Sequence, residues 1–354
     1  MSPTRTRHTQ HALHIVSSSN DIISINKECV LFGGHTLYYY ICTMKKSEFS
    51  FIGDIAKLFG ALPHSGFEPI GDDCTVFDMG DEALVMTTDM LIEDVHFLRS
   101  ASSAEEVGEK SLMVNLSDVA AMGAKPIATL LSIALPESAQ EVWAEEFMRG
   151  YHTASQREGV ALVGGDTTAS RDKIAINVVA IGRAPKANIK RRSAAKVGDV
   201  VCVTGKLGIS SKGLVDIMFG DLNTAAAKAH RRAQARIAEG IWLGKCNEVH
   251  AMMDISDGIA SDIKHIMELS GVGATIELDK IPTDYDIRYA TTGGEDYELL
   301  LTVDGDSFDE VATALYNATG TTLTAIGCIT EGSTLAWLED GKPTDMELKG
   351  FTHF

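Results

Sequence analysis

The sequence lacks an excess of positive charge. Its 31 lysines and arginines stand against 49 aspartates and glutamates, which gives a formal net charge of −18 and an isoelectric point near 5.0. Such a chain would repel nucleic acid and an anionic membrane surface. We therefore expect neither as the main partner, and we expect a phosphate-bearing substrate to bind together with cations.

Closely spaced cysteine pairs and long apolar runs are also missing. The six cysteines are scattered with no CxxC spacing, which is typical of reduced thiols and not of a disulfide framework or a zinc site. No apolar run reaches the roughly 18 residues that a membrane-spanning helix needs. The apolar stretch 29–42 lies too far from the first residue for a signal peptide. These features predict a cytoplasmic protein with no membrane partner.

A length of 354 residues favours two domains. Residues 1–43 differ in composition from the rest, and Met44 is a plausible true start, so this segment is either a spurious upstream extension or a disordered tail. Strand-like and helix-like segments alternate in 44–184 and again in 185–354, with the basic, turn-rich stretch 185–198 as linker. This pattern predicts an α/β (or α+β) protein with an N-terminal mixed sheet and a C-terminal α/β domain.

Aspartates recur where short apolar runs stop, at Asp73, Asp89, Asp166 and Asp254. We interpret each run as a short buried strand that opens into a carboxylate. Rigid strand ends aimed the same way can hold oxygen atoms around a hard cation such as Mg²⁺. A lone aspartate beside a threonine is more often a turn or a helix cap, but four such clusters in one chain favour a magnesium-and-phosphate site.

The segment 104–122 has the spacing of a long, largely apolar helix. Ser111, Asn115 and Asp118 recur on it at i, i+4 and i+7, which places them on one face. A solvated stripe is the ordinary explanation, but such a stripe would carry long charged side chains, and these are short. We therefore expect Asp118 to face the other aspartates. Ser256 and Asp257 precede a helix, and a capping role explains them equally well.

The remaining candidates leave alternatives open. The glycine-rich stretch 205–213 fits neither GxGxxG nor GxxxxGK[ST], and a plain strand-to-helix turn explains it better than a phosphate loop. Glu295 could form an ion pair or bind a cationic ligand. Arg192 could be solvated or clamp a phosphate. His96 stands alone, and no Ser-His-Asp or Cys-His arrangement suggests a general base.

A series of motifs, in order along nearly all of the chain past Met44, resembles the thiamine-monophosphate kinases of the aminoimidazole-ribonucleotide synthetase-like superfamily. The motifs are IGDDC (70–74), TTDMLIEDVHF (87–97), NLSDVAAMGAKP (115–126), GGDTT (164–168), DISDG (254–258), GGEDYEL (293–299) and KGFTHF (349–354). The resemblance implies a homodimer that transfers the γ-phosphoryl group of ATP to thiamine monophosphate, with several Mg²⁺ ions as cofactors.

The resemblance also implies roles for individual residues. Those that would hold Mg²⁺ are Asp73, Thr87, Thr88, Asp89, Asp118, Asp166, Asp254 and Asp257. Gly165, Arg192 and Ser256 would contact ATP, and His96, Glu295 and Phe351 would contact the thiamine moiety. No residue is implied as a general base.

Three alternatives come from the same superfamily and one from another class. Selenophosphate synthetase would be expected to carry a reactive cysteine in an N-terminal glycine-rich loop, but residues 44–70 contain none. The hydrogenase-maturation dehydratase would end in cysteine, whereas this chain ends in His353-Phe354. Aminoimidazole-ribonucleotide synthetase is the third. A non-catalytic magnesium–nucleotide-binding protein would need neither His96, Glu295 nor the aromatic tail.

Overall fold

The computed structural model describes residues 31–32, 35–36, 48–344, 346 and 348–351. The chain divides into two units, Met1–Cys42 and Thr43–Phe354. In the first unit, β1 (Leu31–Phe32) pairs antiparallel with β2 (His35–Thr36). The rest of the expected N-terminal extension lies outside the described residues. Everything below concerns the second unit.

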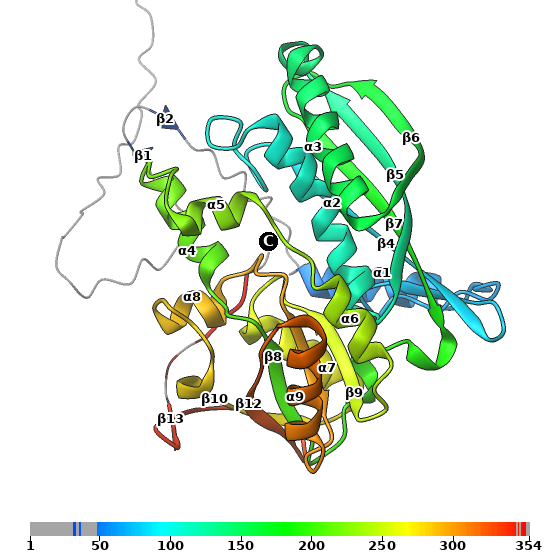
Figure 1. Ribbon diagram of the computed structural model, residues 1–354, viewed down its shortest axis with the longest axis vertical. Helices are drawn as coiled ribbons and strands as arrows, with labels where there is room; N and C mark the ends of the chain where they lie inside the picture. Colours follow the sequence, from blue (N-terminus) through cyan, green and yellow to red (C-terminus); the bar gives the residue numbers. More distant parts are fainter. Residues whose placement is uncertain (1–30, 33–34, 37–47, 345, 347, 352–354) are drawn as a thin grey trace, which may run out of the picture. The chain divides into compact units, whose positions relative to one another are not determined.

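The described residues of the second unit form the helices and strands labelled in Figure 1. The helices are α1 (Glu48–Phe59), α2 (Ala104–Ala121), α3 (Val142–Glu158), α4 (Ile209–Met218), α5 (Ala225–Arg231), α6 (Ile237–Gly244), α7 (Ile259–Ser270), α8 (Ile287–Thr292) and α9 (Phe308–Thr319). The strands are β3 (Thr75–Asp78), β4 (Glu82–Ile92), β5 (Lys125–Leu135), β6 (Ala161–Ala169), β7 (Ala175–Pro185), β8 (Val200–Thr204), β9 (Val249–Asp254), β10 (Gly273–Glu277), β11 (Leu299–Val303), β12 (Leu323–Thr330), β13 (Leu335–Glu339) and β14 (Lys342–Pro343).

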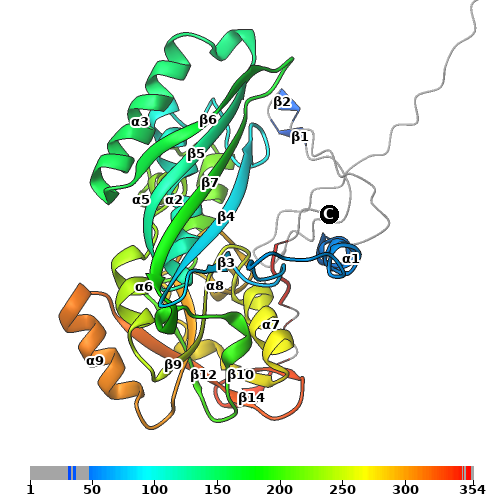
Figure 2. The same ribbon diagram turned by 90° about the vertical axis from the view of Figure 1, so that its right-hand side faces the viewer.

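The N-terminal sheet has the strand order β3-β4-β7-β5-β6 and is mixed, because β5 and β6 run parallel while the other pairs are antiparallel. The helices α2 and α3 cover one face of it (Figures 1 and 2). Along β7, Ile176, Val178 and Ala180 are buried and alternate with partly exposed residues, the pattern of a sheet that packs on one face. Among the residues that the structure describes, no helix covers the opposite face (Figure 2).

The helix α2 is fixed at its start and along its length. Ser103 caps it by accepting a hydrogen bond from the backbone N–H of Glu106, and the Glu106 carboxylate accepts one from the backbone N–H of Ser103. The helices α2 and α3 touch at Gly108, where a Cβ atom would lie 2.1 Å from the carbonyl oxygen of Phe147. Only glycine permits this approach, which sets the position of the residues that α2 presents to the site.

The C-terminal sheet has the strand order β14-β13-β10-β12-β8-β11-β9. Its strands β8, β11 and β9 are buried on both faces: Met253 and Leu300 pack with α7, and Met252 and Leu301 pack with α6 and α9. Figure 2 shows α7 and α9 on opposite sides of this sheet. The expected mixed N-terminal sheet and C-terminal α/β domain are therefore confirmed. Within the residues described, no helix is both long and apolar enough to cross a membrane.

The expectation that the aspartates sit at the ends of short buried strands is correct only for Asp254, the last residue of β9. Asp73 lies two residues before β3, and Asp89 lies inside β4. Asp166 lies inside β6, all of whose residues are exposed. Polar residues within a strand do not end it when neighbouring strands supply the backbone hydrogen bonds, and an edge strand need not be buried.

Candidate active site

Three carboxylates that are far apart in the sequence meet in the second unit. Asp73, Asp118 and Asp254 each place one oxygen atom within 4.8 Å of the other two. Asp73 comes from the loop before β3, Asp118 from α2, and Asp254 from the end of β9. We call these three residues the acidic cluster. It is built from both the N-terminal and the C-terminal sheet regions.

Hydroxyl groups hold two of the three carboxylates. Thr87 Oγ1 donates a hydrogen bond of 2.5 Å to Oδ2 of Asp118, and Ser117 Oγ donates one of 2.5 Å to Oδ2 of Asp254. Oδ2 of Asp73 is buried without a hydrogen-bond partner among the described residues. A buried carboxylate oxygen without a donor, beside two further carboxylates, fits a hard divalent cation.

The charges of the cluster are crowded. Burial and the neighbouring charge of Asp73 raise the pKa of Asp254 to about 8. Burial, followed by the charges of Asp89 and Asp254, raises the pKa of Asp118 well above its usual value. The pKa of Asp89 rises to about 6 through burial and the charge of Asp73. A bound cation would relieve this repulsion and favour the ionised carboxylates.

Arg192 reaches the cluster from the segment between the two sheets. Its Nη2 lies 2.5 Å from Oδ1 of Asp73, and its backbone N–H donates to Oδ1 of Asp72 at 2.8 Å. The arginine is thus not a solvated linker residue. It places a cationic fork beside the acidic cluster, where a phosphate group could bind.

Ser256 and Asp257 follow Asp254, and neither caps α7. The N-cap position of that helix is Gly258, which has no side-chain cap. The carbonyl of Ser256 accepts a hydrogen bond of 2.8 Å from the backbone N–H of Glu295. The backbone N–H of Asp257 donates to Asp262 at 3.3 Å. The N-cap residue is therefore neither Ser256 nor Asp257, and both closely follow Asp254 of the cluster in the chain.

The strand register divides the other predicted metal ligands between the two faces of the N-terminal sheet. One row of directly paired residues is Asp89, Val178, Leu131 and Gly165, and the next is Met90, Asn177, Ser132 and Asp166. Paired residues share a face. Asp89, whose backbone N–H donates to Asn115 of α2 at 2.9 Å, is therefore on the helix-covered face with Gly165. Asp166 is on the uncovered face.

Thr87 and Thr88 follow the same division because neighbouring strand residues point to opposite faces. Thr87 reaches Asp118 of α2, whereas the hydroxyl of Thr88 accepts a hydrogen bond of 2.7 Å from Asn177 Nδ2. A single chain thus brings Thr87, Asp89 and the acidic cluster together. It does not bring Thr88 and Asp166 to them.

Two of the three residues predicted to bind the thiamine moiety lie around one lysine. Lys110 Nζ donates to Glu295 Oε2 at 3.1 Å and to the carbonyl oxygen of His96 at 3.4 Å. Nδ1 of His96 accepts from the backbone N–H of Ile92 at 3.0 Å. The third residue, Phe351, is 48% exposed, and its backbone N–H donates to the carbonyl oxygen of Asp257 at 3.0 Å.

Sequence reasoning missed Lys110, Ser117 and His230, which contact the predicted residues directly. Lys110 and Ser117 are seven residues apart on the predicted helix 104–122 and thus share a face, a signal that was present in the sequence. His230 lies in α5, with its Nδ1 3.3 Å from Glu295 Oε2. No motif or spacing marks this histidine.

The glycine-rich stretch 205–213 forms the turn between β8 and α4. Asp296 accepts hydrogen bonds from the backbone N–H groups of Gly208 at 2.6 Å and Ser210 at 3.2 Å. Burial raises the pKa of Asp296 to about 7 even though these bonds act against the rise. Because a carboxylate of the same chain already uses these N–H groups, the arrangement favours the strand-to-helix turn over the phosphate loop.

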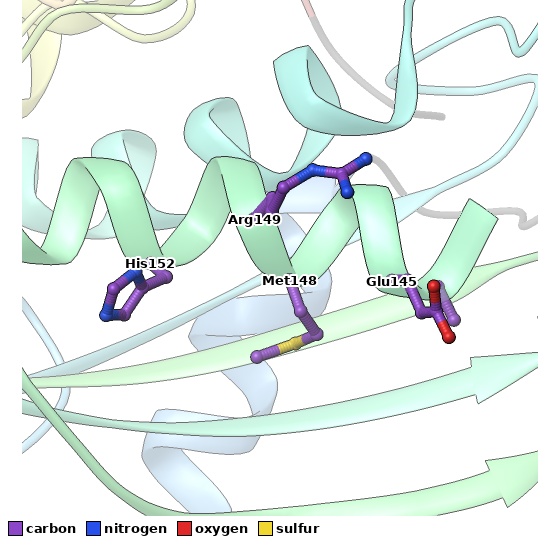
Figure 3. Close-up of a pocket in the computed structure, with 5 residues that line it drawn as sticks. Glu145, Met148, Arg149 and His152 are labelled. Atoms are coloured by element: carbon purple, nitrogen blue, oxygen red, sulfur yellow. The ribbon is translucent and has the colours of Figure 1, made fainter. Parts of the chain in front are cut away.

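A surface hollow elsewhere on the molecule contains none of the predicted residues. It is lined by Ala144, Glu145, Met148, Arg149 and His152, all from α3 (Figure 3). Arg149 lies 2.9 Å from Glu105 in an exposed ion pair. One helix face with a solvated ion pair is no catalytic site, so the acidic cluster remains the candidate.

Comparisons with known proteins agree with this arrangement. Residues 71–184 match the family described as AIR synthase related protein, N-terminal domain, and residues 196–337 match its C-terminal domain. The thiamine-monophosphate kinase of Escherichia coli K12 is 35% identical over 335 residues, covering 88% of this chain and 99% of that protein.

Solved structures match in the same way. The structure described as "AaThiL complexed with AMPPCP and TMP" has 33% identity and a TM-score of 0.75, covering 87% of this chain and 97% of that one. The crystal structure of thiamine monophosphate kinase from Aquifex aeolicus has 32% identity and a TM-score of 0.71, covering 83% and 97%.

Proposed function

This chain belongs to the thiamine-monophosphate kinase family, and from that premise we propose that it transfers the γ-phosphoryl group of ATP to thiamine monophosphate, giving thiamine diphosphate and ADP. The observation that carries the proposal is the acidic cluster of Asp73, Asp118 and Asp254, with Arg192 beside it. The relative described with AMPPCP and TMP supports the choice of substrates.

We propose that the acidic cluster and its neighbours hold Mg²⁺. Asp73, Asp118 and Asp254 would be central ligands, because their oxygen atoms already converge and one of them has no donor. Further proposed ligands are Thr87, Asp89 and Asp257. Thr88 and Asp166 are also proposed as Mg²⁺ ligands, from the uncovered face of the N-terminal sheet. When bound, Mg²⁺ would neutralise phosphate charge and let two anions approach each other in an acidic protein.

The residues around the cluster would bind and orient the two phosphate substrates. Arg192 would contact ATP phosphate oxygens with its guanidinium group, together with Ser256 and Gly165. A Cβ atom at Gly165 would lie 1.8 Å from the carbonyl oxygen of Leu131, so this residue must be glycine for β6 to pair as it does. His96, Glu295 and Phe351 would contact the thiamine moiety.

The proposed reaction needs no general base. The acceptor is a phosphate monoester with a second pKa near 6, so it is already largely ionised at pH 7. What the site must supply is alignment of the two phosphates and compensation of their charge. The acidic cluster with bound cations and Arg192 would provide both.

We propose further that the protein is a homodimer formed through the uncovered face of the N-terminal sheet. That face carries apolar side chains that the chain itself leaves accessible: Met90 is 52% exposed, and Met86, Leu130, Val179 and Ile181 are only partly buried. A second copy would cover them. Thr88 and Asp166 share this face, so the partner surface would lie beside two proposed ligands.

We also propose a role for each of the two domains. Residues 44–184 would form the ATP- and Mg²⁺-binding domain, and residues 185–354 the C-terminal domain. Asp254 and Glu295 belong to the second part but meet Asp118 and Lys110 of the first. Substrate binding would therefore depend on how the two parts pack.

The test is a product assay with purified protein, ATP and Mg²⁺. With thiamine monophosphate, we expect thiamine diphosphate and ADP to appear in equal amounts. With free thiamine, we expect no product, because a bare hydroxyl group leaves the position of the acceptor phosphate unfilled. Comparable turnover of free thiamine would contradict direct transfer between two phosphates. Nucleotide binding with no product from thiamine monophosphate would contradict the kinase activity itself.

A further inference from the structure

Glu295 is held in an unusual backbone conformation. Its φ angle is 65°, and that of Tyr297 is 52°, both in the left-handed region that favours glycine. The backbone N–H of Glu295 donates to the carbonyl oxygen of Ser256 at 2.8 Å, and that of Tyr297 donates to Ile255 at 3.0 Å. Such conformations persist where the surroundings fix them, and they concentrate at functional sites.

The Glu295 carboxylate is held from its buried side by groups of two different helices. Lys110 of α2, whose side chain is 4% exposed, places Nζ 3.0 Å from Oε1 and 3.1 Å from Oε2. His230 of α5 places Nδ1 3.3 Å from Oε2 and 3.0 Å from Ser210 Oγ. The Glu295 side chain remains 26% exposed. Lys110 thus fixes both oxygen atoms of the carboxylate, while the side chain as a whole stays partly exposed.

The charges at this position cancel. Burial raises the pKa of Glu295, but the charge of Lys110 and its hydrogen bond act against this rise, so the pKa is lowered overall and the carboxylate is ionised. Burial and the charge of Lys110 lower the pKa of His230 to about 4, which leaves its imidazole neutral at pH 7. Lys110 and Glu295 therefore form a pair without net charge.

A neutral pair is a poor counter-ion but a well-oriented hydrogen-bond acceptor. An ionised carboxylate accepts at about four positions, and Lys110 uses some of them from the buried side. Thiamine offers two different groups: a cationic thiazolium ring, and an uncharged pyrimidine with an amino group that donates hydrogen bonds. Because the pair has no net charge, it favours binding of the amino group over binding of the cationic thiazolium ring.

On the basis of the proposed function, we propose that Lys110 is a positioning residue that fixes the Glu295 carboxylate as the acceptor for the aminopyrimidine amino group of the substrate. It acts through Glu295 and touches no substrate itself. The same lysine also donates a hydrogen bond to the carbonyl oxygen of His96. One side chain therefore contacts two of the residues that we propose to bind the thiamine moiety.

The first test is a double-mutant cycle on the full chain. Lys110→Met and Glu295→Gln should each raise KM for thiamine monophosphate about tenfold, with KM for ATP and kcat little changed. The double variant should be no worse than Glu295→Gln, because the lysine then has nothing left to position. Lys110→Arg keeps the charge and should recover part of the loss. If the double variant raised KM by the product of the two single effects, the two residues would act independently and the proposal would be overturned.

The second test uses the monophosphate of oxythiamine, in which an oxygen replaces the amino group. Wild type should prefer thiamine monophosphate by about tenfold or more in kcat/KM, and Glu295→Gln should lose most of that preference. Equal use of both substrates by wild type would overturn the amino-group assignment. Should Lys110→Met not fold, as judged by melting and AMPPCP binding, Lys110→Arg and Glu295→Gln still decide the question. A wild-type protein that makes no thiamine diphosphate would instead refute the proposed function.

Discussion

Ser117 Oγ donates a hydrogen bond of 2.5 Å to Oδ2 of Asp254, which joins α2 to the last residue of β9. The two residues are 137 positions apart, and both are buried. Ser117 precedes Asp118 directly, so one turn of α2 supplies a carboxylate to the acidic cluster and fixes another. The geometry of the cluster thus depends on the packing of the two sheet regions.

Ser117→Ala should destabilise the protein by about 1–3 kcal/mol, because it leaves an oxygen of Asp254 buried without its donor. It should also raise the Mg²⁺ concentration needed for half-maximal turnover, since Asp254 loses its fixed orientation. Ser155→Ala is the matched control: Ser155 Oγ is buried and has no partner among the described residues. The measurement is the free energy of unfolding of both variants by chemical denaturation. An equal loss in Ser117→Ala and Ser155→Ala would contradict this role of Ser117.

The pKa of His230 predicts a loss of stability in acid. Burial and the charge of Lys110 lower that pKa from 6.5 to about 4, so between these values the unfolded chain binds a proton that the folded chain does not. The free energy of unfolding therefore falls as pH drops from 6.5 to 4. In His230→Gln this fall should be smaller, by up to about 3 kcal/mol. Denaturation midpoints that fall equally in both proteins would contradict it.

The uncovered sheet face predicts a homodimer in solution. Light scattering at micromolar concentration should give the mass of two chains. Met90→Arg places a charge on that face and should shift the mass toward one chain, whereas Met79→Arg, at a 44% exposed position in the turn between β3 and β4, should not. A wild-type mass of one chain would refute this interface.

A chain that starts at Met44 should fold and work like the full chain. The described part of the candidate site lies entirely beyond residue 48, within the unit Thr43–Phe354. Melting temperature and turnover of the truncated protein should match those of the full-length one. A measurable drop in either value would show that residues 1–43 contribute to the active protein.

The helix face of α2 could be predicted from the sequence, because it depends on local spacing alone. Asn115 accepts a hydrogen bond from the backbone N–H of Asp89, and Asp118 is part of the acidic cluster, as their shared face indicated. The side of the sheet on which Asp166 lies could not be predicted. It depends on the pairing of β5 with β6 and on the register shift between them, which no local pattern encodes.

Contacts between residues far apart in the sequence could not be predicted either. Lys110 and Glu295 are 185 residues apart, and no local sequence pattern in either segment predicts their contact. His230 is a single histidine in a short helix, and only the packing of α5 brings it to Glu295. The motifs identified Glu295 alone among these residues, and the fold supplied its partners.

Thiamine diphosphate formation by Asp254→Asn, measured beside its melting temperature with and without Mg²⁺ and AMPPCP, tests the central claim most directly. The amide keeps the shape of the side chain and removes the charge that would hold the cation. Turnover should be nearly abolished and the ligand-induced rise in melting temperature lost, while the ligand-free protein melts as wild type does or higher, because crowded carboxylates repel one another. Asp78→Asn, at an exposed surface carboxylate, should change none of these. A variant that melts far below wild type yet still makes thiamine diphosphate would contradict the account.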